Sequence, residues 1–194
     1  MKKTSKILYL IGASGSGKDS IIFALRQHID VSQARPNLMV THRYICRDWH
    51  SGSENHIQLS EKEFCQRKQL GLFALDWQAN GLRYGIGREI DLWLAQGQTV
   101  IVNGSRGYLS TARALYSEQL MPVLITVDEA ILRQRLIDRG RESIDDIDSR
   151  IIRNQQLMRE QKLLTDCYRI DNSTQIDHAV KQLMVYINRL LDHH

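Results

Sequence analysis

The sequence predicts an α/β protein in which helices cover both faces of a parallel sheet. Three short and almost wholly apolar runs have the composition of strands buried on both faces: Ile7–Ile11, Thr99–Val102 and Val123–Val127. A segment with the apolar spacing of a helix follows each run, so strands and helices alternate. The 194 residues suit one domain, and a hydrophobic content of 42% supports a core of normal size.

In the first half of the chain, a glycine-rich loop leads from the first strand into a helix. Ser60 and Glu63 have the spacing of a capping box, which opens a helix that runs to about Leu70. Asn80–Gly81 is a turn signal between two strand-like segments and predicts a hairpin. The expected elements are a helix at 18–28, a strand at 38–41, a helix at 60–70, hairpin strands at 72–77 and 83–85, and a helix at 86–96.

The second half keeps a regular alternation of strands and helices. We expect helices at 108–118, 130–139 and about 147–164, a short strand at 168–170 and a closing amphipathic helix at 176–191. The alternation fails between about 43 and 85, where the segment 43–56 is polar and without period. We therefore expect a single domain over 1–194 with an inserted subdomain at about 43–85.

Composition narrows the choice of partners and compartment. Lys and Arg total 26 against 22 Asp and Glu, and this net charge of +4 suits acidic small molecules but is too small to indicate nucleic acid. The three cysteines lie far apart and predict neither a disulfide framework nor a zinc ribbon, so a reducing cytoplasm is expected. No stretch approaches a membrane span, so we expect no membrane partner. A monomer or a homodimer remains open.

The stretch GASGSGKDS at 12–20 follows the phosphate-loop pattern G-x-x-x-x-G-K-[ST] except at its last position, Asp19. The glycines permit tight turns that point backbone N–H groups at phosphate oxygens, and the following helix adds its positive end. Lys18 can then reach the outer phosphates of ATP or GTP. The residues expected to bind the nucleotide here are Gly12, Ala13, Ser14, Gly15, Ser16, Gly17, Lys18, Asp19 and Ser20.

Asp19 has two interpretations. The hydroxyl normally found at this position holds Mg²⁺, and a carboxylate is also a hard oxygen ligand, so Asp19 is predicted to bind the metal. Alternatively, Asp19 only places negative charge in a first helical turn, and Ser20 or water serves the metal. Many such folds carry a metal-binding Asp at the end of a later strand, where this chain has Asn103. That exchange favours the first interpretation.

An arginine-rich segment follows the helix at 130–139. Arg135, Arg139 and Arg141 surround the helix end, and Arg150 lies beyond an acidic stretch. Phosphoryl transfer needs positive charge around the moving group and exclusion of water. We therefore expect a lid at about 135–150 whose Arg135, Arg139 and Arg150 act in catalysis with Lys18. The alternative is a solvated, salt-bridged helix.

Four motifs in order resemble the guanylate-kinase-like nucleotide kinases over nearly the whole chain: GASGSGKD, S-x-x-E-F at 60–64, G-x-x-Y-G at 81–85 and R-x-x-x-R-G-R-E at 135–142. The resemblance implies a P-loop NTPase fold, ATP as phosphoryl donor and Mg²⁺. The parts by which guanylate kinases bind GMP are altered. Leu75 and the segment 103–106 stand where acids would read guanine, while Arg47 and Tyr84 are retained. GMP is therefore not the expected acceptor. A basic acceptor site suited to a phosphorylated molecule without a base is still suggested by Arg43, Arg47, His50, His56, Arg83 and Arg106.

Further shared stretches at 15–19, 42–48, 52–60, 77–85, 87–94 and 102–106 resemble the ribose 1,5-bisphosphate phosphokinases. That resemblance implies phosphorylation of ribose 1,5-bisphosphate at its 1-phosphate, which yields 5-phospho-α-D-ribose 1-diphosphate (PRPP). Asn172 is implied to lie near adenine. The implied acceptor-binding residues are Arg47, His50, Glu54, Asn55, His56, Tyr84 and Arg106. A nucleoside monophosphate kinase with another base specificity and a non-catalytic interaction module remain alternatives.

Overall fold

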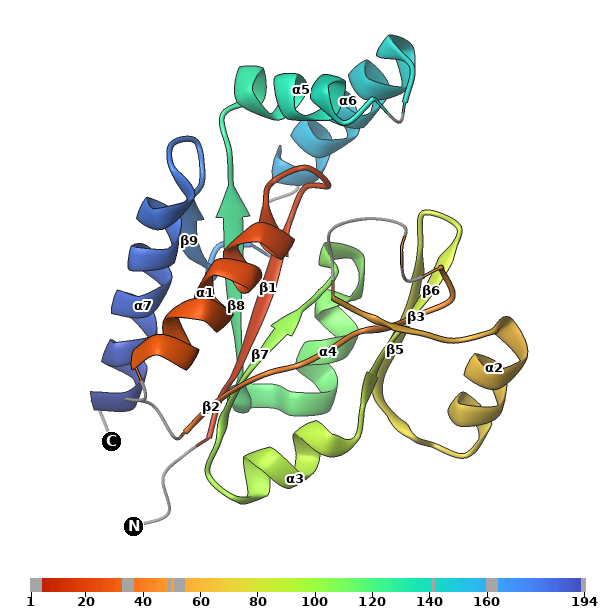
Figure 1. Ribbon diagram of the computed structural model, residues 1–194, viewed down its shortest axis with the longest axis vertical. Coiled ribbons are helices and arrows are strands. Elements are labelled where there is room, and N and C mark those ends of the chain that lie inside the picture. Colours follow the sequence, from red (N-terminus) through yellow and green to blue (C-terminus); the bar gives the residue numbers. More distant parts are fainter. Residues whose placement is uncertain are drawn as a thin grey trace.

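The central element of the computed structural model is a five-stranded parallel sheet (Figure 1). Its strand order is β2 (Leu38–Val40), β7 (Thr99–Asn103), β1 (Ile7–Gly12), β8 (Leu120–Thr126) and β9 (Tyr168–Asp171). The structure describes residues 5–32, 37–48, 50, 55–140, 142–159 and 164–192. The predicted parallel sheet is confirmed.

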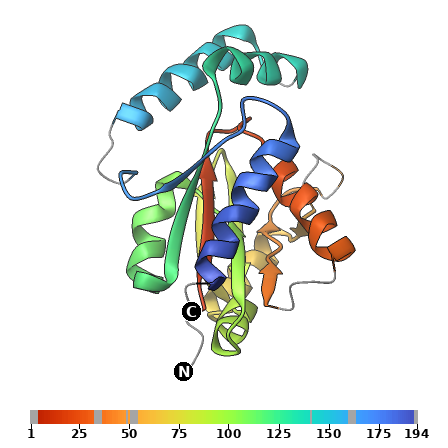
Figure 2. The ribbon, with the colours of Figure 1, turned by 90° about the vertical axis from the view of Figure 1, so that its left-hand side faces the viewer.

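Helices cover both faces of this sheet, as Figure 2 shows. The odd and even residues of β1 point to opposite faces, and both sets are buried. Leu8 and Leu10 pack with α1 (Lys18–Ser32) and α7 (Ile176–Asp192), whereas Ile7, Tyr9 and Ile11 face the side of α3 (Glu89–Ala95) and α4 (Leu109–Tyr116). The three-layer α/β architecture is thus confirmed, because an all-apolar strand requires cover on each face.

The segment between β2 and α3 forms a second sheet of strand order β4 (Ile57–Gln58), β3 (Tyr44–Ile45), β6 (Leu82–Gly87) and β5 (Phe73–Ala79). The predicted hairpin is β5–β6, and its turn residues Asn80 and Gly81 both have positive φ. Helix α2 (Glu61–Gln69) begins at the predicted cap, where the Glu63 backbone N–H donates to Ser60 Oγ. The sequence did not predict β3 and β4, each two residues long.

The predicted start of the helix at 86–96 is wrong. Ile86 pairs with Leu75 in the second sheet, and β6 continues to Gly87 before α3 begins at Glu89. Ile86 is buried in the core, so burial of its side chain in the strand outweighs the helical spacing that it shares with the residues after it.

Helices α5 (Glu129–Asp138) and α6 (Ile144–Arg159) lie across the carboxyl ends of β1 and β8 (Figure 1). Leu132 and Leu136 of α5 pack with Ile147 and Ile151 of α6 and with Ala13. The start expected for α6, about Ile147, is too late, because Ser143 Oγ accepts the Asp146 backbone N–H and so caps the helix earlier. None of the helices in the described part of the chain has the length and apolar character that a bilayer crossing requires.

Candidate active site

The phosphate loop joins β1 to α1 and is enclosed on several sides. Gly15 and Gly17 have φ of +92° and +86°, a conformation that favours glycine. A Cβ on Gly12 would lie 2.7 Å from the Ile125 backbone oxygen, and one on Gly15 would lie 2.8 Å from Leu132 Cδ1 of α5. The glycines of the motif are therefore required by backbone conformation and by lack of space.

Asn172, directly after β9, holds the phosphate loop in place through a hydrogen bond to its backbone. Its side chain is 1% exposed, and its Nδ2 donates to the Ser16 backbone oxygen at 2.7 Å. Its backbone oxygen accepts from Arg135 Nη2 at 2.9 Å. Asn172 thus links the loop to α5, and its expected position near adenine stays a prediction.

Replacing Asn172 by alanine is expected to loosen the loop, because it leaves the buried Ser16 carbonyl without its donor. The free energy of unfolding should fall by about 1–3 kcal/mol, and the KM for ATP should rise. Thermal unfolding and initial rates at varied ATP measure both effects. Thr174→Ala, at an exposed neighbouring position, is the control; equal behaviour of the two variants would contradict the supporting role.

Lys18 lies in the first turn of α1, and its Nζ donates to the backbone oxygens of Gly12 and Ala13, both at 3.0 Å. Burial lowers the pKa of Lys18 to about 8, although the nearby Asp19 charge opposes this effect. The charges of Arg43, Arg106 and Arg139 lower the pKa of Lys18 further. Cations from several elements therefore surround the loop, as binding of a polyanion requires.

Asp19 and Asn103 are direct neighbours. Asn103 ends β7, and the parallel pairing places it opposite Leu10 of β1, next to the loop. Its Nδ2 donates to Asp19 Oδ1 at 2.6 Å, and its own buried Oδ1 has no hydrogen-bond partner. A carboxylate beside an unsatisfied amide oxygen is a donor set that Mg²⁺ accepts, so these residues fit the expected ion. No group of three or more His, Cys, Asp and Glu suited to a metal occurs among the described residues.

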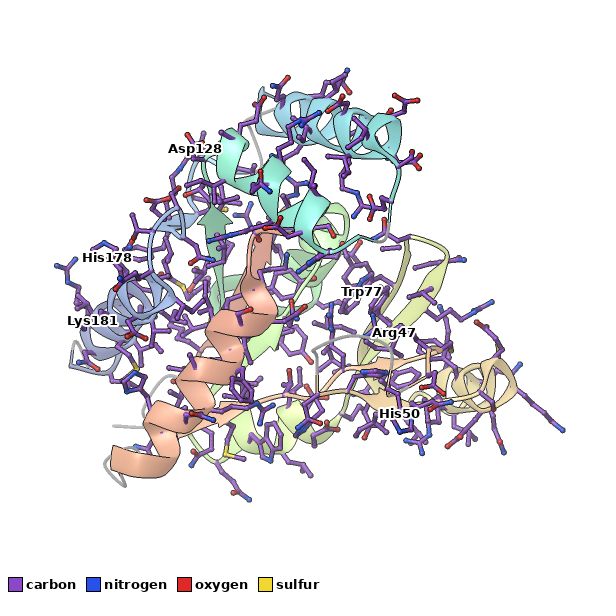
Figure 3. All side chains as sticks on the ribbon, turned by 45° about the horizontal axis from the view of Figure 1, so that its top comes forward. Arg47, His50, Trp77, Asp128, His178 and Lys181 are labelled. Atoms are coloured by element: carbon purple, nitrogen blue, oxygen red, sulfur yellow. The ribbon has the colours of Figure 1, made fainter. Side chains whose placement is uncertain are left out.

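The second sheet brings part of the predicted acceptor set together. Arg47 Nη2 lies 3.4 Å from His56 Nδ1, and His56 Nε2 lies 3.2 Å from the Arg47 backbone oxygen. Tyr84 is buried and stacks on Trp77, with ring centroids 5.5 Å apart. In Figure 3, Arg47 and Trp77 lie on the side of the second sheet, across the molecule from His178 on α7.

The remaining predicted acceptor residues have other contacts. His50 has a side chain 71% exposed, and its Nδ1 lies 3.3 Å from Asp48 Oδ1. Asn55 Nδ2 lies 3.2 Å from His42 Nε2. Arg106 Nη1 donates to Asn154 Oδ1 of α6 at 2.7 Å, and burial lowers the pKa of Arg106. Glu54 lies outside the described residues.

The arginines of the predicted lid differ in their surroundings. Arg135 is held by the Asn172 backbone, and its buried Nη1 has no hydrogen-bond partner, beside Gly17. Arg139 caps the end of α5 and acts electrostatically on Lys18. Arg150 pairs with Glu142 at 2.9 Å. Arg141 lies outside the described residues.

Arg43, one of the basic residues that the sequence suggests for an acceptor site, contacts both parts of the site. Its Nη2 lies 3.6 Å from Asp19 Oδ1, and its guanidinium lies over the Tyr84 ring, 5.0 Å from the centroid. The signal in the sequence was a basic residue at the start of a polar segment, and nothing there specified its partners.

Comparison with known proteins extends these observations. The chain is 48% identical over 176 residues, 91% of its length, to a ribose 1,5-bisphosphate phosphokinase of Pectobacterium parmentieri, of which it covers 90%. It is 42% identical over 184 residues to the protein of that name from Azotobacter vinelandii, covering 95% of this chain and 96% of that protein. No family model matches the chain.

Among solved structures, the guanylate kinase of Anaplasma phagocytophilum aligns with a TM-score of 0.72 over 98% of this chain and 89% of that one. The sequence identity is 14%, so this likeness concerns the fold, and it confirms the guanylate-kinase-like architecture. The identity of 42–48% over nine-tenths of the chain concerns the family. The chain therefore belongs to the family of ribose 1,5-bisphosphate phosphokinases.

Proposed function

We propose that this protein transfers the terminal phosphoryl group of ATP to the 1-phosphate of ribose 1,5-bisphosphate, giving ADP and PRPP. The observation that carries the proposal is identity of 48% over 91% of the chain with a phosphokinase of that name. The geometry agrees, because a glycine loop with Lys18 at its end lies beside a second group of basic residues on the second sheet.

The donor site is the phosphate loop. Its backbone N–H groups and the start of α1 receive the phosphates, and Lys18 exchanges its bonds to the loop carbonyls for bonds to phosphate oxygens. Asp19 and the Asn103 amide oxygen are the residues that would hold Mg²⁺. When bound, that ion offsets the negative charge of the β- and γ-phosphates.

On the acceptor side, Arg47, His56 and Tyr84 bind phosphate, with His50 and Arg106 adding positive charge. Asn55 and Glu54 bind ribose hydroxyls. An oxygen of the 1-phosphate attacks the γ-phosphorus, the bond to the β–γ bridging oxygen breaks, and the electron pair leaves with ADP. The nucleophile is already anionic at neutral pH, so the reaction requires no general base. The protein supplies orientation and charge.

The lid in this proposal is the segment at about 135–150, which includes the end of α5 and the start of α6. Arg135 offers a buried Nη1 beside the loop, and Arg139 lies close enough to affect Lys18. Arg150 leaves Glu142 to join the transferring phosphoryl group when the lid closes. Closure removes water, which limits hydrolysis of ATP.

We also place the protein in the cytoplasm. Cys46, Cys65 and Cys167 are not joined in disulfides, as a reducing compartment maintains. ATP, the proposed donor, is abundant there.

A coupled ADP-release assay with magnesium and ATP tests the function. Ribose 1,5-bisphosphate and GMP are offered in parallel, and phosphorus NMR identifies the product. ADP release with a new pyrophosphate signal from the sugar is the expected result. Turnover with GMP alone would overturn the acceptor assignment and leave only the donor site standing.

Introducing the acid that guanylate kinases use is not expected to create a GMP kinase. Leu75 is 1% exposed and packs with Trp77, Tyr84 and Ile86, so the glutamate of Leu75→Glu enters an apolar region. The second acid would still be absent near Ser105. GMP-dependent ADP release by the folded variant should stay at background, with the volume-conserving Leu75→Met as control. Robust GMP phosphorylation by Leu75→Glu would contradict this prediction.

A further inference from the structure

Arg43 lies where the two sheets of the protein meet. It follows β2 of the central sheet and directly precedes β3 of the second sheet. Its side chain is 13% exposed. Its Nη2 approaches Asp19 at the end of the phosphate loop, and its guanidinium carbon lies over the Tyr84 ring.

The Arg43 guanidinium lies against an aromatic stack. The rings of Trp77 and Tyr84 are nearly parallel, with an interplanar angle of 7°, and Arg43 lies on Tyr84. Trp77 and Tyr84 are both buried in the core shared by the second sheet and the central sheet. Arg43 is therefore held in place by Tyr84 and Asp19 before any ligand arrives, which lowers the entropy lost when it binds an anion.

The contact with Asp19 shows that the Arg43 guanidinium can pair with an anionic oxygen at this position. Its Nη2 is 3.6 Å from Asp19 Oδ1, the same oxygen that accepts from Asn103. A guanidinium has five N–H donors in one plane, so Arg43 can keep its ring contact while it binds a phosphate. The charge of Arg43 also reaches Lys18, whose amine serves the donor phosphates. An anion bound by Arg43 thus lies on the donor side of the acceptor site.

We propose that Arg43 binds the reacting 1-phosphate of the acceptor, while Arg47 and His56 bind its 5-phosphate. This assignment rests on the proposed function and adds to it a division of labour between two basic positions. Arg47 and His56 contact each other and belong to the segment beyond β3, whereas Arg43 contacts the P-loop end of α1. Arg43 then selects sugars that carry a phosphate on the anomeric carbon and holds the nucleophilic oxygen toward ATP.

The test compares Arg43→Gln and Arg47→Gln with the control Arg88→Gln, whose exposed side chain pairs with Asp91 away from the site. Arg43→Gln is expected to lower kcat/KM for ribose 1,5-bisphosphate by roughly 10²–10³-fold, with little change in the KM for ATP. Arg43→Lys keeps the charge without the planar fork, so it should recover only part of this loss. Thermal unfolding verifies that each variant is folded.

Inhibition by two sugars that each carry one phosphate distinguishes the role of Arg43 from that of Arg47. Arg43→Gln should weaken inhibition by ribose 1-phosphate and spare inhibition by ribose 5-phosphate, and Arg47→Gln should do the reverse. Wild-type turnover with unchanged ribose 1-phosphate inhibition in Arg43→Gln would overturn the assignment of Arg43 alone. Absence of wild-type turnover with ribose 1,5-bisphosphate would overturn the proposed function and this assignment with it.

Discussion

Replacing Lys18 by alanine is expected to lower kcat/KM by at least roughly 10²–10³-fold and to leave the fold intact. The amine donates to the loop carbonyls of Gly12 and Ala13 and belongs to no apolar cluster, so the core is left intact when it is removed. The transferring phosphoryl group, however, loses a fixed positive charge. ADP release and thermal unfolding measure the two parts. Lys6→Ala, a lysine that donates to the Glu118 backbone, is the control.

The pH dependence of ATP binding provides a second test of the role of Lys18. Burial brings the pKa of Lys18 down to about 8, so the amine of the free protein begins to lose its proton near that pH. ATP favours the charged amine, and the KM for ATP should therefore rise between about pH 7 and about pH 9. A KM that stays flat over this range, or phosphoryl transfer preserved in Lys18→Ala, would contradict the role of Lys18.

The double variant Asp19→Ser/Asn103→Asp is expected to recover most of the activity that each single substitution removes. Asp19→Ser removes the carboxylate, and Asn103→Asp places a second carboxylate against the first, where a 2.6 Å hydrogen bond now exists. Each should lower activity by roughly 10²-fold or more. The double variant restores a hydroxyl after the lysine and an acid at the end of β7, the usual arrangement of the phosphate-loop motif.

Binding of Mn²⁺ in the presence of ATP, followed by electron paramagnetic resonance, provides a readout that does not depend on turnover. The double variant should bind Mn²⁺ and recover activity to within about tenfold of the wild type. Additive losses in the double variant would show that positions 19 and 103 do not act as one unit. Ser20→Ala is the matched variant for the alternative interpretation. Loss of Mn²⁺ in Ser20→Ala but not in Asp19→Ser would favour that alternative.

The central sheet was predictable because its strands carry their own signal. Ile7–Ile11 is apolar at every position, which only a strand buried on both faces requires. Strands β3 and β4 carry no such signal, since each has two residues and depends on partners far along the chain: Tyr44 pairs with Ile57 and with Gly85. Their position follows from tertiary pairing, which local pattern does not encode.

The residues of the site also divide into those that local sequence predicts and those that depend on tertiary contacts. The spacing of Gly12, Gly17 and Lys18 predicts the loop, because one local backbone conformation performs the binding. The sequence shows that Asn103 stands where many such folds have a metal-binding Asp. Its contact with Asp19 follows from the pairing of β1 and β7. The Arg43 contacts were not visible, since they require two sheets to meet.

The strand order of the central sheet affects how this protein emerges during synthesis. β1 lies in the middle of the sheet, yet its neighbours β7 and β8 begin at Thr99 and Leu120. At about 5–20 residues per second, β1 leaves the ribosome on the order of 10 s before those neighbours are made. During that interval the apolar run Ile7–Ile11 has no sheet to join and is open to chaperones and to other nascent chains. The nucleotide site therefore forms late, although its loop is translated well before β7 and β8.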